Sequence, residues 1–520
     1  MIDNSSGDMV PPPPAGTWPR IRIRLRRHRI AVALGLVVAV VVAGAAYRLS
    51  ERDNTCGHSG SGVRRIDGEC VGVTDGSFAF DDAYTGIQRK IAAENAAVSG
   101  SGNTVTIALL DPLTVDATSA NTPAMILNEL EGAYTAQMRI NRTAAIDDPR
   151  PLVKVVLANW GSHELQWKPV VEQLEGMVDD PEPLVAVAGL RLSTVHTESA
   201  AKHLAEHNIP IISSIATADQ LNYGAIRGFV RSAPPNTEYV EALYTYARNN
   251  PELDSAMLVY DSNSDVNDDP GTTSGADLFT RSLREDLEQR FADLNKYRSQ
   301  SYQGVSGPKA SSPSLFTNVV HNICGTEPKV EVVLYAGRVV DFNNFLQAMY
   351  ARVCVDTPVT VLGASGDFGA LQLRSQEKDL REKNIRIAYA TETDPQGWRQ
   401  NAKDTPKHFG EFLDMFRRLG FDEAHLDDGG AISTHDALLI AAKAARLSAR
   451  AQPGEQPPTH EDVLNQLLNL NIQNKVPAAS GDLEFSFRGA DSGNPSNKPI
   501  PVIEVPSNAP AQTIDVHYTK

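Results

Sequence analysis

The segment His203–His207 reads HLAEH, and its histidines and glutamate are residue types that bind zinc or assist hydrolysis. It matches H-x-x-E-H, a pattern that places two imidazoles and one carboxylate on a single helical turn of a zinc peptidase. The same residues fall in a segment expected to form a helix with a polar, solvated face. A zinc hydrolase is therefore a remote alternative, and we expect no metal ion and no cofactor.

Other catalytic motifs are missing from the sequence. It contains no G-x-S-x-G elbow, no P-loop and no G-x-G-x-x-G. The paired acids Asp427 and Asp428, in HLDDGG, are expected to cap or solvate a loop rather than to act as acid and base. We therefore expect that the protein is not an enzyme.

Hydroxyl side chains follow two apolar runs that read as buried strands. In NIPIISSIATADQL the run Ile209–Ile212 leads into Ser213, Ser214 and Thr217, and PLVAVAG leads into a loop with Ser193 and Thr194. Ligands of parallel sheets bind beyond the carboxyl ends of the strands, and helix N-termini favour anionic groups. These loops are expected to hold a carboxylate, unless their hydroxyls only cap helices.

The elements that position these loops alternate between strands and helices. Short apolar runs such as TVTIALLD, LVKVVLA, SAMLVYD, VEVVLYAG and IRIAYAT are separated by amphipathic, helix-length segments. This alternation indicates parallel sheets covered on both faces. One large sheet is possible, but the length favours an α/β fold with two doubly wound, Rossmann-like lobes joined by a hinge.

The N-terminal part predicts a membrane anchor. Residues 30–47 are apolar or small and carry no charge, and six arginines precede them. A run of this length can span the hydrocarbon layer, and the arginines hold the N-terminus in the cytoplasm. We expect an uncleaved, single-pass transmembrane helix and an extracytoplasmic main domain; the alternative is a signal peptide cleaved after the Ala43–Ala45 region. The net charge of −16 argues against a nucleic-acid partner.

Four cysteines suit an oxidising exterior. Cys56 and Cys70 flank a Gly/Ser-rich loop, and Cys324 and Cys354 lie in a later α/β region. Their spacing fits no zinc pattern. Two local disulfides, Cys56–Cys70 and Cys324–Cys354, are the simplest of the three possible pairings.

Several segments together resemble one protein family. PLVAVAGLRLSTVHTESAAKHLAEHNIPIISSIATADQL is similar to the characteristic segment of the type I periplasmic solute-binding proteins, the leucine/isoleucine/valine-binding and receptor ligand-binding-region family. TIALLDPLT resembles the first strand of that family and its loop, and AMLVYDS, VEVVLYAGR and STHDALLIAAKAARL resemble further landmarks in the same order. The resemblance covers about residues 104–505 and implies a two-lobed binding protein.

The resemblance also implies ligand contacts. In amino-acid-binding members, hydroxyl loops hold the ligand's α-carboxylate, an acidic residue binds the α-ammonium and an aromatic side chain lines the cleft. The corresponding residues are Ser193, Thr194, Ile215, Ala216, Thr217, Ser365 with Asp367 nearby, Arg338 at the aromatic position and Trp160 as a stacking face. Arg338 could instead form a surface salt bridge, and Trp160 could lie in the core. These departures favour a ligand that is more anionic than an ordinary amino acid, or differently shaped.

The expected domain organisation has five parts. They are a basic cytoplasmic tail (1–29), the transmembrane anchor (30–47), an extracytoplasmic linker (48–103), a first lobe (104–233 and 396–475) and a second lobe (234–395 and 476–510). We expect a solute-binding protein that captures a small polar ligand, anionic or amino-acid-like, by hinge closure for uptake through an ABC permease. The alternative is a membrane-anchored sensor that signals through a partner protein.

Overall fold

The computed structural model describes residues 56, 62–146, 148–265, 277–305, 311–400, 405–451, 456–489, 492–507 and 513–520. The chain divides into two compact units, residues 1–59 and 60–520, and the fold described below is that of the second unit. The predicted tail 1–29 and anchor 30–47 lie outside the described residues. Within the described ranges, none of the helices has both the length and the apolar character needed to cross a membrane.

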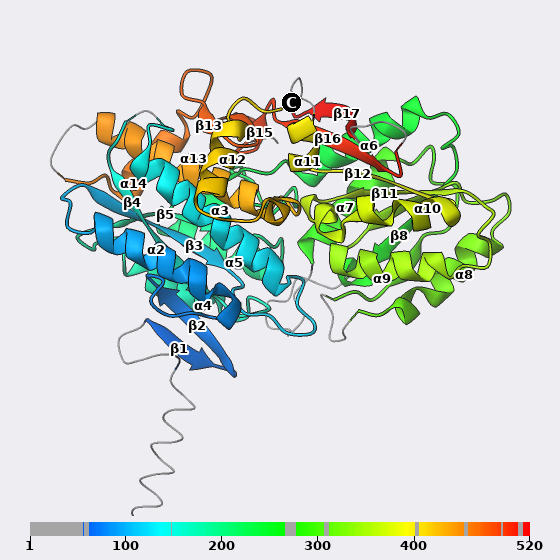
Figure 1. Cartoon of the computed structure of the whole chain (residues 1–520), viewed down its shortest axis with the longest axis horizontal. Coiled ribbons are helices and arrows are strands. Elements are labelled where there is room, and N and C mark those ends of the chain that lie inside the picture. The colour runs from blue at the N-terminus through cyan, green and yellow to red at the C-terminus, as the bar shows by residue number, and fades with distance from the viewer. Residues whose placement is uncertain are drawn as a thin grey trace, which may run out of the picture. The chain divides into compact units, whose positions relative to one another are not determined.

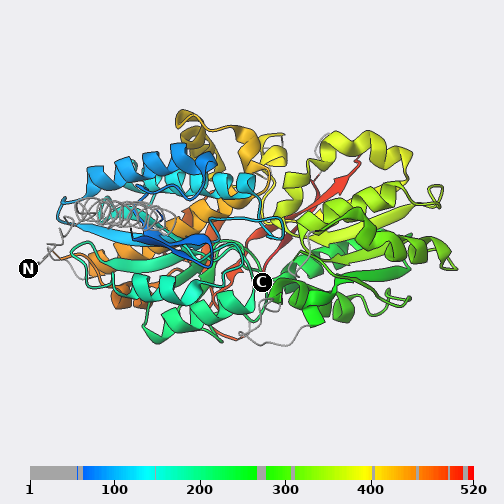
Figure 2. The same cartoon turned by 90° about the horizontal axis from the view of Figure 1, so that it is seen from below.

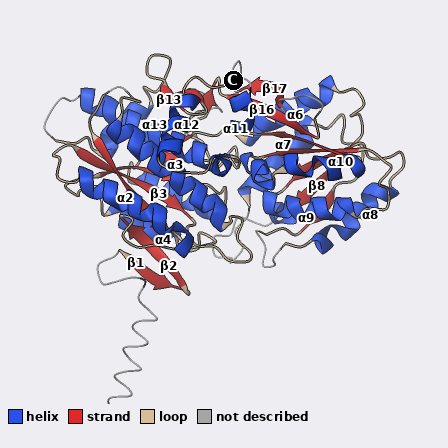
Figure 3. Ribbon diagram, in the orientation of Figure 1, coloured by secondary structure: helices blue, strands red, loops and turns tan. Residues whose placement is uncertain are grey.

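Within the described residues, two seven-stranded sheets form the centres of two lobes (Figures 1 and 3). The first sheet has the order β1-β2-β4-β3-β5-β6-β7, and β3 to β7 run parallel. Its strands are β1 (Val63–Ile66), β2 (Glu69–Thr74), β3 (Thr104–Asp111), β4 (Leu152–Asn159), β5 (Leu184–Gly189), β6 (Ile211–Ser213) and β7 (Phe229–Arg231). The first lobe is this sheet with the helices that cover it.

Helices cover both faces of the first sheet. The helices α2 (Thr85–Val98), α3 (Pro123–Arg142), α13 (Gly430–Ala451) and α14 (His460–Leu467) pack on one face, and α4 (Trp167–Glu175) and α5 (Val195–Glu206) on the other. Every residue of β3 is buried, as expected for a strand covered on both sides. The helices α3 and α13 approach so closely that a side chain at Gly132 would collide with the Ala431 carbonyl.

The second sheet is built in the same way. Its order is β17-β16-β12-β11-β10-β8-β9, with β8 to β12 parallel and β16 and β17 antiparallel at one edge. Its strands are β8 (Ala256–Asp261), β9 (Gln300–Tyr302), β10 (Val332–Ala336), β11 (Val359–Ala364), β12 (Ile385–Ala390), β16 (Pro499–Val505) and β17 (Thr513–Tyr518). The second lobe is this sheet with its helices.

Alternate residues of the second sheet face different helices. Val333 and Val361 pack under α9 (Val339–Tyr350) with α8 (Thr317–Gly325) and α10 (Glu377–Glu382), whereas Val332 and Leu334 face α6 (Asn236–Asn249) and α7 (Leu278–Arg290). This period of two is the pleat of a strand buried on both sides. The α/β class with two parallel-dominated sheets is confirmed, and the alternative of one large sheet is wrong.

Two of the expected lobe limits are corrected. Residues 63–98, expected within the linker 48–103, supply β1, β2 and α2 to the first lobe, because β2 pairs antiparallel with β4. The strands β13 (Val476–Ala478) and β14 (Gly481–Phe485) were expected in the second lobe but pack on the core of the first. With β15 (Pro495–Ser496) they form a three-stranded sheet, so the third crossing between lobes falls between β15 and β16 (Figure 2).

All four cysteines are disulfide-bonded in the structure, as the sequence predicted. Cys324 and Cys354 are joined in the second lobe, where their Cα atoms lie 5.5 Å apart. Cys56 and Cys70 are disulfide-bonded as well, so the described residues include no free thiol. Cys324 and Cys354 are 30 residues apart in sequence, so their disulfide closes a loop in the unfolded chain. The closed loop lowers the conformational entropy of the unfolded state and so favours folding.

Candidate functional site

The parallel strands of both lobes end toward a common region between them. From the first lobe, the loop after β5 carries Ser193 and Thr194, and from the second lobe the turn after β10 carries Arg338. The lobes meet here, because the backbone N–H of Phe279 donates to the carbonyl of Ser193 at 3.1 Å and Thr194 forms a β-bridge with Asp277. This meeting point is where a doubly wound fold places a ligand.

The hydroxyls of the β5 loop have internal partners. Thr194 caps α5, since its Oγ1 accepts from the backbone N–H groups of His196 and Thr197, and it donates to the carboxylate of Glu164. The Ser193 hydroxyl accepts from the N–H of Ala218 at 3.2 Å. The Thr194 contacts match the capping alternative, whereas the Ser193 hydroxyl holds the loop after β6.

The loop after β6 is also closed on itself. Ile215, Ala216 and Thr217 are all buried. The Ala216 N–H donates to the hydroxyl of Ser213, and the Ala216 carbonyl accepts from buried Arg231 at 3.0 Å. The Thr217 carbonyl accepts from the N–H of Asn236 at 2.8 Å, so this loop connects the first lobe to the start of α6.

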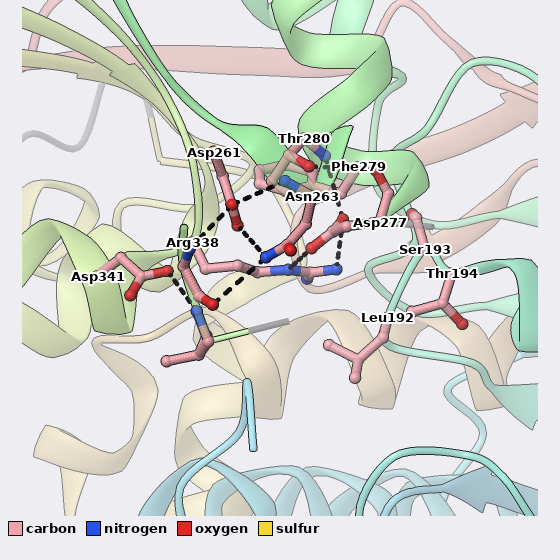
Figure 4. Close-up of polar contacts among 12 residues, drawn as sticks. Leu192, Ser193, Thr194, Asp261, Asn263, Asp277, Phe279, Thr280, Arg338 and Asp341 are labelled. Atoms are coloured by element: carbon pink, nitrogen blue, oxygen red, sulfur yellow. Dashed lines mark hydrogen bonds and ion pairs between the residues drawn. The ribbon is translucent and has the colours of Figure 1, made fainter. Parts of the chain in front are cut away.

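Arg338 pairs with Asp277 rather than forming a surface ion pair (Figure 4). Its Nε lies 2.8 Å from Asp277 Oδ2 and its Nη2 lies 3.0 Å from Oδ1, which is the bidentate geometry of a strong pair. The guanidinium also lies 4.9 Å from the centroid of the Phe279 ring. Asp277 is fully buried and caps α7. The charge of Arg338 therefore compensates a buried carboxylate of the second lobe.

Three more carboxylates surround this pair. Asp261 accepts from the N–H groups of Asn263 and Gly304, and Asp341 accepts from the N–H of Val305. Burial is the largest influence on both, and it raises the pKa of Asp261 to about 7 and that of Asp341 to about 6. Burial likewise raises the pKa of Glu164 to about 7, although the hydrogen bonds from Thr194 and Thr197 act to lower it. Buried carboxyl groups therefore gather around the Arg338–Asp277 pair.

Replacing Glu164 by glutamine is expected to change how stability depends on pH. Burial raises the pKa of Glu164 to about 7 in the folded chain from an ordinary value of 4.5, so the folded state binds more protons than the unfolded state between these pH values. The free energy of unfolding should therefore fall as pH rises from 4.5 to 7, by about 3 kcal/mol from this group. Urea unfolding of the full-length chain should be measured at pH 4.5 and pH 8. Between these pH values, the unfolding free energy of Glu164→Gln should rise relative to that of wild type by about the same amount.

The control for this comparison is Glu382→Gln, because Glu382 is exposed on α10. Its unfolding free energy should follow that of wild type at both pH values. Parallel pH profiles for wild type and Glu164→Gln would show that Glu164 is an ordinary, ionised carboxylate in the folded chain.

The three other residues predicted to contact a ligand are Trp160, Ser365 and Asp367. Trp160 is completely buried in the core under α4 and α5, so it offers no stacking face. Ser365 directly follows β11 and donates its backbone N–H to Ala390 at 3.1 Å. Asp367 belongs to the 3-10 helix η4 (Gly366–Leu371), and its side chain lies outside what the structure describes.

A cavity of about 570 Å³ lies between the lobes. The first lobe contributes the start of α3 and the segment before α13, and the second contributes the start of α9 and η4. The lining residues are Thr122, Ala124, Met125, Leu127, Asn128, Val339, Val340, Asn343, Asn344, Gly369, Leu371, Gln372, Asp422, Ala424, His425, Asp427 and Asp428. An adjoining cavity of about 310 Å³ shares Gly369, Gln372 and Asp427.

The larger cavity is acidic. Its described lining contains Asp422, Asp427 and Asp428 but neither lysine nor arginine. Burial raises the pKa of Asp427, whose Oδ2 accepts from Gln396 at 2.6 Å. Asp428 accepts from the N–H of Gly430 at the start of α13 and from the amide of Asn128. Asp428 therefore holds the start of α13, Asp427 binds Gln396, and both acids line the cavity.

The sequence interpretation missed several of these residues. Asp261 ends the strand AMLVYD, so the strand-end argument that selected Ser193 could have found it. Asp277 and Glu164 gave no such signal, because their neighbours in space are distant in sequence.

No protein-family model matches the chain, and no curated protein matches it. Three solved structures are similar in fold. The branched-chain amino acid substrate-binding protein LivJ of Streptococcus pneumoniae, in complex with isoleucine, has a TM-score of 0.53 and 14% identity over 80% of this chain and 99% of its own. The leucine-binding protein LivK of Thermotoga maritima has a TM-score of 0.53 and 12% identity over 80% and 98%. A solute-binding protein of an ABC transporter from Rhodopseudomonas palustris, in complex with p-hydroxybenzoic acid, has a TM-score of 0.57 and 12% identity over 80% and 98%.

These likenesses agree with the two sheets and the crossings between the lobes. The chain therefore has the fold of the type I periplasmic binding proteins.

Proposed function

We propose that this protein is an extracytoplasmic solute-binding protein that captures a small polar ligand between its lobes and delivers it to an ABC-type permease. The observation that carries the proposal is the cavity of about 570 Å³, which is lined from both lobes. Its volume lies in the range of about 300–1,000 Å³ typical of small-molecule sites. A ligand that contacts both lobes stabilises the closed state over the open one, which is the basis of hinge closure.

The ligand is proposed to carry an ammonium or a similar hydrogen-bond donor. Asp422, Asp427 and Asp428 line the cavity, and its described lining contains neither lysine nor arginine. The expectation of an anionic ligand rested partly on Arg338, whose charge is paired with Asp277. An amino-acid-like ligand remains compatible with this lining through its ammonium group.

The membrane anchor is a further part of the proposal. The arginines before the uncharged run 30–47 support a single pass with a cytoplasmic N-terminus. Protease added to intact cells should remove the main domain and leave a membrane-held N-terminal fragment. A soluble protein that begins near Ala46 would show instead that the run is a cleaved signal.

The ligand proposal predicts a specific loss of affinity. A thermal-shift screen of the full-length chain should include amino acids, amines, carboxylic acids, sugars and short peptides, and calorimetry should measure the compounds that stabilise it. Asp427→Asn should then weaken binding about ten- to a hundredfold, because a charge-assisted hydrogen bond contributes about 1.5–3 kcal/mol.

The matched control is Thr217→Ala, since Thr217 lies in the loop after β6 and does not line this cavity. It should leave the affinity unchanged. Equal binding by wild type and Asp427→Asn, with a loss in Thr217→Ala, would move the ligand to the hydroxyl loops.

A further inference from the structure

Two histidines and one glutamate meet on the outer helices of the first lobe, away from the cavity. His203 lies on α5 and His207 is its C-cap residue, one turn later, while Glu175 ends the neighbouring helix α4. Both helices pack on the same face of the first sheet (Figure 1). His203 is 25% exposed, His207 50% and Glu175 17%, so the group is open to solvent on one side.

The geometry of the three side chains suits a metal ion. Glu175 Oε1 lies 3.1 Å from His203 Nε2 and 3.1 Å from His207 Nδ1, and one ligand atom from each residue lies within 4.8 Å of the others. Zinc bonds of about 2.1 Å in a tetrahedron place ligand atoms about 3.4 Å apart. Small side-chain rotations would therefore bring all three onto one ion.

One further observation favours a bound cation. Glu175 Oε1 is shielded from solvent and has no hydrogen-bond partner among the described residues, although two imidazoles lie close to it. His207 Nδ1 also lies 3.0 Å from the carbonyl oxygen of His203, so this nitrogen must be deprotonated and turn from the carbonyl when it binds the ion.

The glutamate of the HLAEH motif does not belong to this group. Glu206 is 73% exposed, and its carboxylate lies 4.0 Å from His203 Nδ1. The zinc-peptidase arrangement, in which the motif's own glutamate acts beside both histidines, is therefore not formed. His203 is nine residues along α5 from Thr194, about 14 Å from the meeting point of the lobes.

We propose that Glu175, His203 and His207 bind one Zn²⁺ ion with a water molecule at the open fourth position. Imidazole and carboxylate ligands suit zinc, and three protein ligands plus water is a common coordination. The ion would join the C-terminal ends of α4 and α5. Binding to the folded chain alone then stabilises the first lobe by mass action.

The test is calorimetric titration of the metal-free, full-length chain with ZnCl₂, followed by measurement of Tm with and without zinc. Wild type should bind one ion per chain and gain in Tm. Glu175→Gln, His203→Ala and His207→Ala should each weaken zinc binding at least tenfold. Each of these variants should unfold within a few degrees of wild type without zinc, which separates lost binding from lost folding.

Two control variants locate the ion. Glu206→Gln and His163→Ala should bind zinc like wild type, because Glu206 is 73% exposed and lies near Nδ1 of His203 rather than the Nε2 that faces Glu175, and His163 pairs with Asp116 elsewhere. The Trp167 ring lies 5.9 Å from the His203 ring, so Cu²⁺ at this site should quench tryptophan fluorescence less in Trp167→Phe. Absence of zinc binding in wild type, unchanged binding in all three ligand variants, or an equal loss in Glu206→Gln would overturn the proposal.

Discussion

Arg338→Ala is expected to lower the free energy of unfolding by about 3–5 kcal/mol. Arg338 is the bidentate partner of Asp277, whose side chain is fully buried. Without the guanidinium, this carboxylate would remain inside the protein without its main counter-charge. The charge of Arg338 also lowers the pKa of Glu164 and of Asp341, both of which burial raises, so its loss should favour their protonation.

Urea unfolding of the full-length chain measures this effect. Arg248→Ala is the matched control, because Arg248 and Asp293 form an ion pair at 3.2 Å with side chains 56% and 50% exposed. An exposed pair contributes at most about 1 kcal/mol. The double variant Asp277→Asn/Arg338→Met should recover part of the loss, since it removes both charges together. A loss in Arg338→Ala no larger than in Arg248→Ala would contradict the buried-pair interpretation.

Asp436→Ala is expected to destabilise the first lobe by a similar amount, about 3–5 kcal/mol. Asp436 is fully buried on α13 and accepts from the N–H groups of Ala479 and Ser480 and from the Ser480 hydroxyl. Buried Lys498 contacts the same hydroxyl, and burial lowers its pKa while Asp436 raises it. Removal of the carboxylate leaves the Ala479 and Ser480 donors without their acceptor and removes a negative charge that favours the charged form of buried Lys498.

The Asp436 carboxylate also contacts His435. His435 Nδ1 lies 2.7 Å from Asp436 Oδ1, and burial lowers the pKa of His435 to about 4. His435 is therefore neutral at pH 7 and can donate Nδ1–H to the carboxylate. The expected loss is to be measured at pH 7 for this reason.

The control is Asp148→Ala, since Asp148 and Arg450 form an exposed pair. Its unfolding free energy should change by at most about 1 kcal/mol. Asp436→Asn keeps one acceptor oxygen, so its unfolding free energy should lie between those of Asp436→Ala and wild type. Similar midpoints for Asp436→Ala and Asp148→Ala would mean that other groups hold β14 to α13.

The architecture was predictable because it follows from local pattern. Apolar runs such as Thr104–Asp111 and Leu184–Gly189 predict strands that are covered on both faces. The amphipathic segments between these runs are the helices that cover them. The order of strands and helices then leaves few possible topologies. The pairing of Cys324 with Cys354 was predictable for the same reason, since the two lie close in sequence.

The linker was misassigned because its signal is weak. The strand β1 has four residues, two of them exposed, and β2 has six, so neither is long enough to give a clear strand pattern in the sequence. Only pairing with β4, about 80 residues later in the chain, fixes their place in the first sheet.

By itself, the sequence determined the two-lobed α/β fold and the strand ends at which loops would gather, since both depend on periodicity along the chain. Only the tertiary structure decided what those loops do. It pairs Arg338 with Asp277, commits Thr194 to capping α5, and assembles the acidic cavity from α3, α9, η4 and the segment before α13. The physical reason is that the partners of a charged or hydroxyl side chain are set by packing between distant segments, which no local pattern in the sequence records.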